Sequence, residues 1–210
     1  MQEAAKAAKA DSLPQPDWNT PDSAYVPVTK GSQLMFLYAA FSGMPADYDK
    51  MASAISQDYN MTSDQFKKHD MLAALKPKID AGIADAKAHP YIIITEDNPN
   101  LGHYDFQRKA FPVGSALFQS GGYERFFDAG ANYTLSVTNG QTFQQLNVPN
   151  ENLAKTIEAQ VSHYGNFKER IYAFVQGTDD SSGPMINAEI TKVELLDSRG
   201  QVLLQQAASH

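Results

Sequence analysis

Cysteine is absent from this chain of 210 residues, and long hydrophobic runs are scarce. Without thiols the chain can form no disulfide, perform no thiol catalysis and bind no metal through thiolate ligands. The longest uncharged apolar stretch, residues 34–44, is far shorter than the roughly 20 residues that cross a bilayer. The sequence therefore excludes a disulfide-stapled mini-protein and predicts no transmembrane segment.

Positive charge is in the minority, because 17 Lys and Arg stand against 24 Asp and Glu, for a net charge of −7. The basic residues are also scattered along the chain rather than clustered. An acidic excess of this kind repels phosphate backbones and anionic lipid headgroups. We therefore expect no nucleic-acid partner.

Common catalytic motifs are missing as well. The chain has no phosphate-binding loop, no GxGxxG, no HExxH, no GxSxG and no calcium-binding loop. No two of the five histidines stand at helical i, i+3 or i, i+4 spacing, so a zinc site would need distant residues such as His103, Asp105 and His163. We expect neither a metal nor a cofactor.

The first 30 residues contain four of the eleven prolines, at positions 14, 16, 21 and 27, in a polar background. This composition disfavours both helix and central strand. It predicts a flexible Pro-rich leader over residues 1–24. The first residues show no apolar run of the kind that a signal peptide needs, so two locations stay open. One is the cytoplasm, and the other is the periplasm or an outer-membrane tether after removal of a signal.

Helical periodicity begins at Ser32. A first helix is expected within residues 32–43 and a second over residues 48–59. A capping-box sequence that starts at Thr62 precedes a third helix, whose apolar stripe continues to Ile83. Pro77 is expected to kink or divide this third helix.

After Pro90 the pattern changes to the alternation that is typical of strands. Residues 91–95 are apolar on both faces, which predicts an interior strand. Asn139-Gly140 is a strong hairpin signal. The other expected elements are strands at 104–111, 131–138, 142–148 and 168–176, a helix at 152–161, and a final hairpin of 186–196 with 201–205.

Helices thus come first and strands follow with short connections, so the predicted class is α+β, with N-terminal helices packed on a largely antiparallel β-sheet. We find no internal repeat and no linker after the leader. The sequence predicts one domain over residues 25–207, with a helical part at 32–89 and a strand-rich part at 91–206.

One candidate binding segment contains His103, Tyr104, Asp105 and Arg108. In a strand, His103 and Asp105 would share one face, while Tyr104, Phe106 and Arg108 would share the other. A polar face beside an aromatic one can bind a ligand. The alternative is that the aromatic side chains belong to the core and the polar ones are solvated.

A second candidate cluster contains Tyr164, Arg170 and Tyr172. Alternation over residues 168–176 places Arg170, Tyr172 and Phe174 on the face opposite the aliphatic side chains. Aromatic side chains beside arginine suit contacts with proteins or sugars. Packing beneath the helices explains the same pattern equally well.

Three segments resemble a family of uncharacterised proteobacterial exported or lipoprotein-like domains. They are residues 25–38 (YVPVTKGSQLMFLY), the helix at 65–83 with its LKPKI motif, and residues 102–106 (GHYDF). The resemblance covers residues 25–205. It implies a location in the bacterial envelope, and it brings no catalytic residue with it.

Two classes of function remain open from the sequence. The first is a non-catalytic periplasmic or envelope domain that binds another envelope protein or envelope component through an aromatic-rich sheet face. The second is a hydrolase of an unrecognised family, with His103, Asp105 or Arg108 near its site. Convergence of these side chains in a deep pocket would favour the hydrolase.

Overall fold

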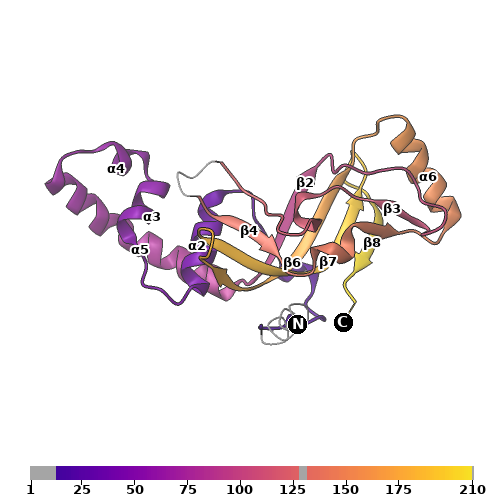
Figure 1. The fold of residues 1–210 in the computed structure, drawn as a ribbon. Helices are drawn as coiled ribbons and strands as arrows, with labels where there is room; N and C mark the ends of the chain where they lie inside the picture. The colour runs from indigo at the N-terminus through magenta and orange to yellow at the C-terminus, as the bar shows by residue number, and fades with distance from the viewer. Residues whose placement is uncertain (1–12, 128–131, 210) are drawn as a thin grey trace.

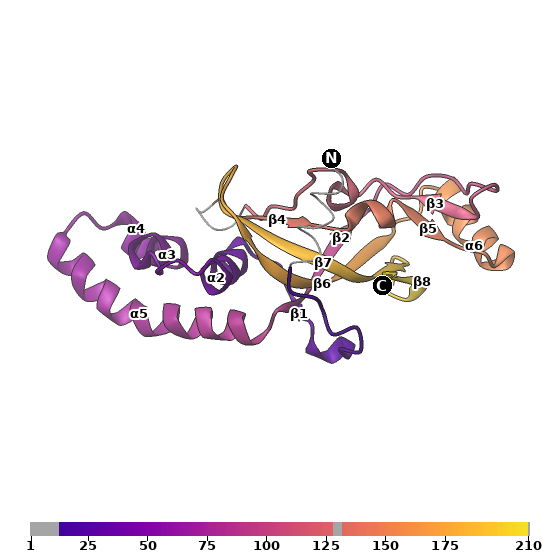
Figure 2. The same cartoon turned by 60° about the horizontal axis from the view of Figure 1, so that its bottom comes forward.

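The computed structural model describes residues 13–127 and 132–209, and it has the expected α+β fold. A six-stranded sheet occupies the middle of an elongated molecule (Figure 1). The helices of the N-terminal third extend from one end of this sheet, and a small two-stranded sheet with a further helix lies at the other end (Figure 2).

The central sheet is largely antiparallel, as expected. Its long strands pair antiparallel in the order β2-β6-β7-β8, whereas β1 joins β2 and β4 joins β7 in parallel. Strands β4 and β8 therefore share one edge of β7, each along a different half of it. The bounds are β1 (Val26–Pro27), β2 (Tyr91–Asp97), β4 (Thr134–Val137), β6 (Lys168–Asp179), β7 (Met185–Leu196) and β8 (Val202–Ala207).

The first helix, α2 (Gly31–Phe41), packs directly on β6 and β7. The expected second helix is instead two short helices, α3 (Tyr48–Ile55) and α4 (Gln57–Met61). They are divided at Ser56, whose backbone is extended and whose hydroxyl accepts a hydrogen bond from the amide of Tyr59. The side-chain cap at Ser56 thus starts a new helix where the apolar periodicity predicted a continuous one.

The helix α5 (Gln65–Ala88) packs along α2 and α3. Asp64 rather than Thr62 caps it, because the Asp64 carboxylate accepts from the amides of Phe66 and Lys67. Pro77 does not divide it, and Figure 2 shows one continuous helix that bends along its length. Among the described residues, no helix has both the length and the apolar content needed to cross a membrane.

A second layer covers the other end of the central sheet. It consists of β3 (Ala110–Pro112) paired with β5 (Gln145–Asn147), two 3-10 turns and the helix α6 (Glu151–Ser162). The turns are η2 (Ala116–Phe118) and η3 (Gly140–Phe143). Fully buried side chains of this layer join the aliphatic face of the sheet in one core; they include Phe111, Phe118, Phe143, Leu146 and Ile157.

The hairpin predicted at Asn139-Gly140 does not form. β4 pairs with β7 and β5 pairs with β3, so the two strands are not partners, and residue 131 of the first lies outside the described residues. Asn139 instead uses its side-chain amide to bond both the carbonyl oxygen and the amide of Ile190, at 2.8 Å each. The Asn139 side chain therefore occupies the part of the β7 edge between β4 and β8.

The strand predicted over residues 104–111 is also wrong for most of its length. Only Ala110–Pro112 is a strand, because residues 105–109 turn back on themselves. The Asp105 carboxylate accepts hydrogen bonds from the amides of Gln107 and Arg108, and Lys109 adopts a φ of 53°. Side-chain capping of this kind competes with strand formation.

The described part of the expected leader contacts the sheet face that points away from the core. The amide of Asp17 donates to the Tyr91 hydroxyl at 2.7 Å, and Gln176 Nε2 donates to the carbonyl oxygen of Pro14 at 3.1 Å. The short 3-10 turn η1 (Asp22–Ala24) follows, and Tyr25 packs on the same face. Residues 1–12 lie outside the described part of the chain.

Candidate functional site

The turn that carries His103 and Tyr104 is held against α6 by one carboxylate. Glu158 accepts hydrogen bonds from His103 Nδ1 at 2.7 Å and from the amide of Tyr104 at 2.9 Å. The hydroxyl of Ser162 donates to the same carboxylate at 3.1 Å. Burial by itself would raise the pKa of Glu158, but these hydrogen bonds outweigh it, and the pKa lies below its ordinary value. Glu158 is therefore an ionised anchor for the turn.

Asp105 and Arg108 belong to the same turn but are occupied with each other. Arg108 donates to Asp105 through its guanidinium at 2.6 Å and through its backbone amide at 3.0 Å. These contacts, the backbone one first, lower the pKa of Asp105. Since the Arg108 side chain is 69% exposed, the pair contributes more to turn geometry than to stability.

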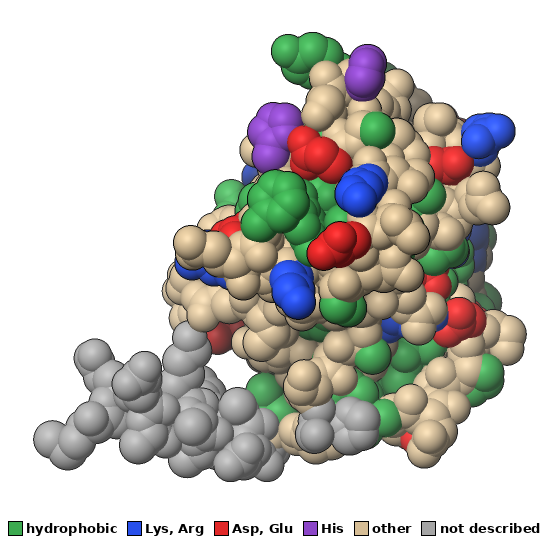
Figure 3. Space-filling view, turned by 90° about the vertical axis from the view of Figure 1, so that its right-hand side faces the viewer, with side chains coloured by type: hydrophobic (Ala, Val, Ile, Leu, Met, Phe, Trp, Pro, Cys, Tyr) green, Lys and Arg blue, Asp and Glu red, His purple; other side chains and the backbone are tan. Residues whose placement is uncertain are grey.

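A small pocket lies between this turn and α6. Its volume is about 140 Å³, and it is lined by Tyr104, Phe106, Glu151, Ala154, Lys155 and Glu158. The Phe106 ring is 84% exposed and stands edge-on to the Tyr104 ring, with 5.1 Å between the ring centroids. Figure 3 shows this end of the molecule, where acidic, basic and histidine side chains surround a large apolar one. We call these six lining residues the α6 pocket.

The Tyr104 ring is fixed from two sides. Its hydroxyl donates to the carbonyl oxygen of Val148 at 3.0 Å, and the ring contacts the fully buried Phe111 with 5.1 Å between centroids. The exposed Phe106 ring therefore rests on a rigid support. Of the first predicted cluster, Tyr104 lines the pocket, His103 borders it through Glu158, and Asp105 with Arg108 shape the turn.

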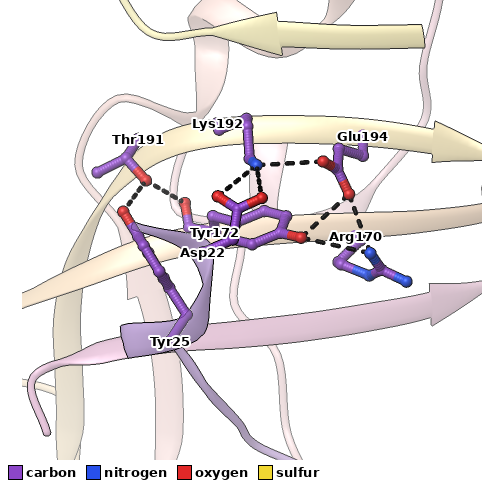
Figure 4. A network of polar contacts seen from close by, with 7 residues as sticks. All are labelled: Asp22, Tyr25, Arg170, Tyr172, Thr191, Lys192 and Glu194. Atoms are coloured by element: carbon purple, nitrogen blue, oxygen red, sulfur yellow. Dashed lines mark hydrogen bonds and ion pairs between the residues drawn. The ribbon is translucent and has the colours of Figure 1, made fainter. Parts of the chain in front are cut away.

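The second predicted cluster is only partly brought together. Tyr172 and Arg170 lie on the sheet face opposite the core, where both bond Glu194 Oε2, at 3.1 and 3.0 Å (Figure 4). Lys192 reaches the other oxygen of Glu194 at 3.1 Å and lies over the Tyr172 ring. Tyr164 follows α6, is 93% exposed and takes no part in this network.

The predicted open aromatic face is therefore covered at Tyr172, which is only 3% exposed. Tyr25 packs edge-on against its ring, and the Tyr25 hydroxyl bonds Thr191 at 2.9 Å. Asp22 accepts from Lys192 with both carboxylate oxygens at 2.7 Å (Figure 4). Burial raises the pKa of both Tyr25 and Tyr172. This network is a structural clasp that holds the segment before β1 on the sheet.

The residues considered for a zinc site do not converge. His103 bonds Glu158, Asp105 bonds Arg108, and His163 Nδ1 lies 2.7 Å from the carbonyl oxygen of Ala159. Within residues 13–127 and 132–209, no group of three or more histidine and carboxylate side chains is arranged to hold a metal ion.

The geometry also lacks the relay that a serine hydrolase uses. The Ser162 hydroxyl contacts the His103 and Glu158 pair, but it donates to Glu158 rather than to His103. A nucleophilic serine must instead give its proton to the histidine that the carboxylate orients. The arrangement around His103 positions a turn and does not activate a hydroxyl.

The α6 side chains of the pocket are candidate site residues that the sequence pattern did not identify. Glu151, Lys155 and Glu158 lie about one helical turn apart, so α6 places them on one face. The expected helix at 152–161 contains Lys155 and Glu158 but begins one residue after Glu151. The helical spacing can be recognised in the sequence, but the contact between Glu158 and the turn at Tyr104, 54 residues earlier, cannot. Comparisons with family models, curated proteins and solved structures found no match to this chain.

Proposed function

We propose that the protein is a non-catalytic protein-binding domain, and that the α6 pocket receives an apolar side chain of the partner. The observation that carries this proposal is the Phe106 ring, which is 84% exposed at the rim of a pocket whose floor, Ala154, is 3% exposed. An aromatic ring that is held out into solvent on a rigid support is typical of an interaction hot spot.

The size of the pocket favours a side chain over a free metabolite. Pockets for small molecules usually measure about 300–1,000 Å³, whereas this one measures about 140 Å³. A leucine, methionine or phenylalanine side chain fits a hollow of this size. Tyr104 and Phe106 would then flank the inserted group, and the charged side chains of α6 would form the polar rim.

Charge favours a partner with basic residues beside the inserted side chain. Glu151 is exposed at the rim and has no ion-pair partner among the described residues, while the whole chain carries a net charge of −7. Opposite charge on the partner would speed association and fix its orientation. The compartment that we propose is the bacterial envelope, which the resemblance to exported domains supports; the cytoplasm is the alternative.

A selection from a random peptide library tests the proposal without a known partner. The immobilised wild-type protein would be the target of the selection, and the affinity of each enriched peptide would then be measured for the Phe106→Ala variant. We expect enriched peptides to share an apolar residue next to Lys or Arg. The matched control is Phe66→Ala, since Phe66 is 87% exposed at the start of α5, remote from α6 in the fold (Figure 1). Peptides that bind the Phe106→Ala protein as well as the wild type would refute the proposal.

A further inference from the structure

Two hollows meet at Phe36, at the end of the molecule opposite α6. The inner hollow measures about 190 Å³ and has mainly aliphatic walls from β1, α2, α5 and β2. The outer hollow measures about 530 Å³ and lies between α2, α3 and α5. Phe36 and Gly82 line both hollows, so the Phe36 ring is the partition between them.

Gly82 is what allows the ring to lie there. A Cβ atom at position 82 would stand 2.7 Å from Cε1 of the Phe36 ring, closer than real contacts allow. The ring therefore lies flush against the backbone of α5. Phe36 is itself only partly buried, so rotation of its side chain would join the two hollows into one cleft.

The inner hollow offers few free polar groups. The Gln33 side chain accepts from the amide of Thr29 at 2.8 Å and donates to the carbonyl oxygen of Pro27 at 2.8 Å. His89 is bonded to Asp85, with 3.1 Å between the ring nitrogen and the carboxylate. With these groups occupied, the remaining wall presents Val26, Val28, Leu37, Ala86 and Ile92.

The outer hollow combines an apolar floor with two cations. Phe36, Ala54 and Ile55 form the apolar part, and Lys30 and Lys78 border it. Neither lysine forms an ion pair within the described part of the chain, although the protein as a whole is acidic. Two unpaired cations beside an apolar cleft are complementary to a molecule with an anionic head and an apolar tail.

We propose that this cleft binds a single-chain fatty acid. Its carboxylate would lie between Lys30 and Lys78, and its alkyl chain would run past Phe36 into the aliphatic inner hollow. This site is separate from the α6 pocket and does not depend on the function proposed there.

Titration of the full-length protein with dodecanoate and with dodecanol, followed by calorimetry below the micelle-forming concentration, tests this site. We expect saturable binding of one dodecanoate per chain. The Lys30→Gln/Lys78→Gln variant should bind dodecanoate at least tenfold more weakly and dodecanol about equally well, because only the carboxylate needs the cations. The control with the same charge change is Lys67→Gln/Lys87→Gln, two exposed lysines of α5 outside both hollows.

A second variant tests the path of the alkyl chain. Gly82→Val should displace the Phe36 ring, occupy the space between the two hollows and weaken the binding of both dodecanoate and dodecanol. A cooperative thermal unfolding transition of this variant would establish that it folds. Phe36→Ala, which removes the partition, should keep or increase the affinity for dodecanoate. Absence of saturable dodecanoate binding to the wild type would overturn the proposal. Equal affinities in the two double-lysine variants would overturn it as well.

Discussion

Glu96 on β2 and Glu169 on β6 are direct cross-strand neighbours, and both carboxyl groups lie on the core side of the sheet. The Ser115 hydroxyl donates to Glu96 at 2.8 Å, whereas neither oxygen of Glu169 has a hydrogen-bond partner among the described residues. Burial, and secondly the charge of Glu96, raise the pKa of Glu169 to about 8. The protein therefore keeps a protonated carboxyl group in its core at neutral pH.

This pair predicts a stability that falls as the pH rises. Because the folded-state pKa lies above the ordinary value of 4.5, the folded protein retains a proton that the unfolded chain loses. The stabilisation is complete below pH 4.5 and is lost as the pH rises through about 8. The loss is on the order of 5 kcal/mol in the free energy of unfolding. Urea unfolding at a series of pH values measures it.

The variant that isolates this effect is Glu169→Gln, which cannot ionise. Its free energy of unfolding should vary less between pH 5 and pH 8 than that of the wild type, and at pH 8 it should be the more stable protein. Asp70→Asn, at an exposed position of α5, is the control and should follow the wild-type curve. If Glu169→Gln has the same pH dependence as the wild type, Glu169 does not titrate as described.

The clasp over Tyr172 predicts that removing the charge of Glu194 destabilises the protein much more than removing the charge of Asp22. The Glu194 side chain is 6% exposed and balances both Arg170 and Lys192, so Glu194→Gln should lower the free energy of unfolding by about 3 kcal/mol. The Asp22 side chain is 63% exposed and forms its ion pair with Lys192, so Asp22→Asn should cost less than about 1 kcal/mol. Denaturant unfolding of both variants measures this difference. Equal losses would contradict the role assigned to Glu194.

The Asn139 side chain predicts a stability effect at a position that looks like a turn. Asn139→Ala leaves the amide and the carbonyl group of Ile190 without partners, which should cost about 2 kcal/mol. Gln141→Ala, two residues further on at an exposed position, should change stability by less than about 0.5 kcal/mol. Thermal unfolding of the two variants gives the comparison, and a neutral Asn139→Ala would show that the edge of β7 does not need this side chain.

The sequence predicted those elements whose signal is long and local. The strands at 91–95, 168–176 and 186–196, the final hairpin and the helix at 152–161 are confirmed with shifts of a few residues at their ends. The segment 91–95 is a continuous apolar run, and the others show a sustained period of two or of 3.6 residues. The α+β class follows from their order, which is why it too was predictable.

The predicted elements that are wrong lie where a polar side chain forms a hydrogen bond with a backbone group. That group is far away in the sequence in one case and only two or three residues away in the other. Asn139 has the hairpin residue types, but its amide pairs with Ile190, which is 51 residues away. Asp105 turns an alternating segment back on itself through the amides of Gln107 and Arg108. Periodicity records which side chains are apolar, and it contains no information about which backbone group a polar side chain will meet.

For the candidate site too, the sequence predicts which residues are involved but not which contacts they make. Their residue types identify His103 and Tyr104 as candidates. The alternative interpretation, in which both aromatic side chains belong to the core, is wrong for Phe106, because the structure exposes the Phe106 ring. Arg170 and Tyr172 were predicted on an outward face, and they are on that face, but the segment that ends at Tyr25 covers it. A sequence pattern gives the face of a strand and does not give what lies on that face.

Binding of one library-selected peptide to the wild type, to Phe106→Ala and to Phe66→Ala tests the proposed function most directly. Both phenylalanine side chains are more than four-fifths exposed, at 84% and 87%, so neither substitution should change the melting temperature appreciably. We predict that Phe106→Ala weakens binding by about 30-fold, which corresponds to about 2 kcal/mol, and that Phe66→Ala leaves it unchanged. Equal affinities for the wild type and Phe106→Ala would contradict the assignment of the α6 pocket as the binding site.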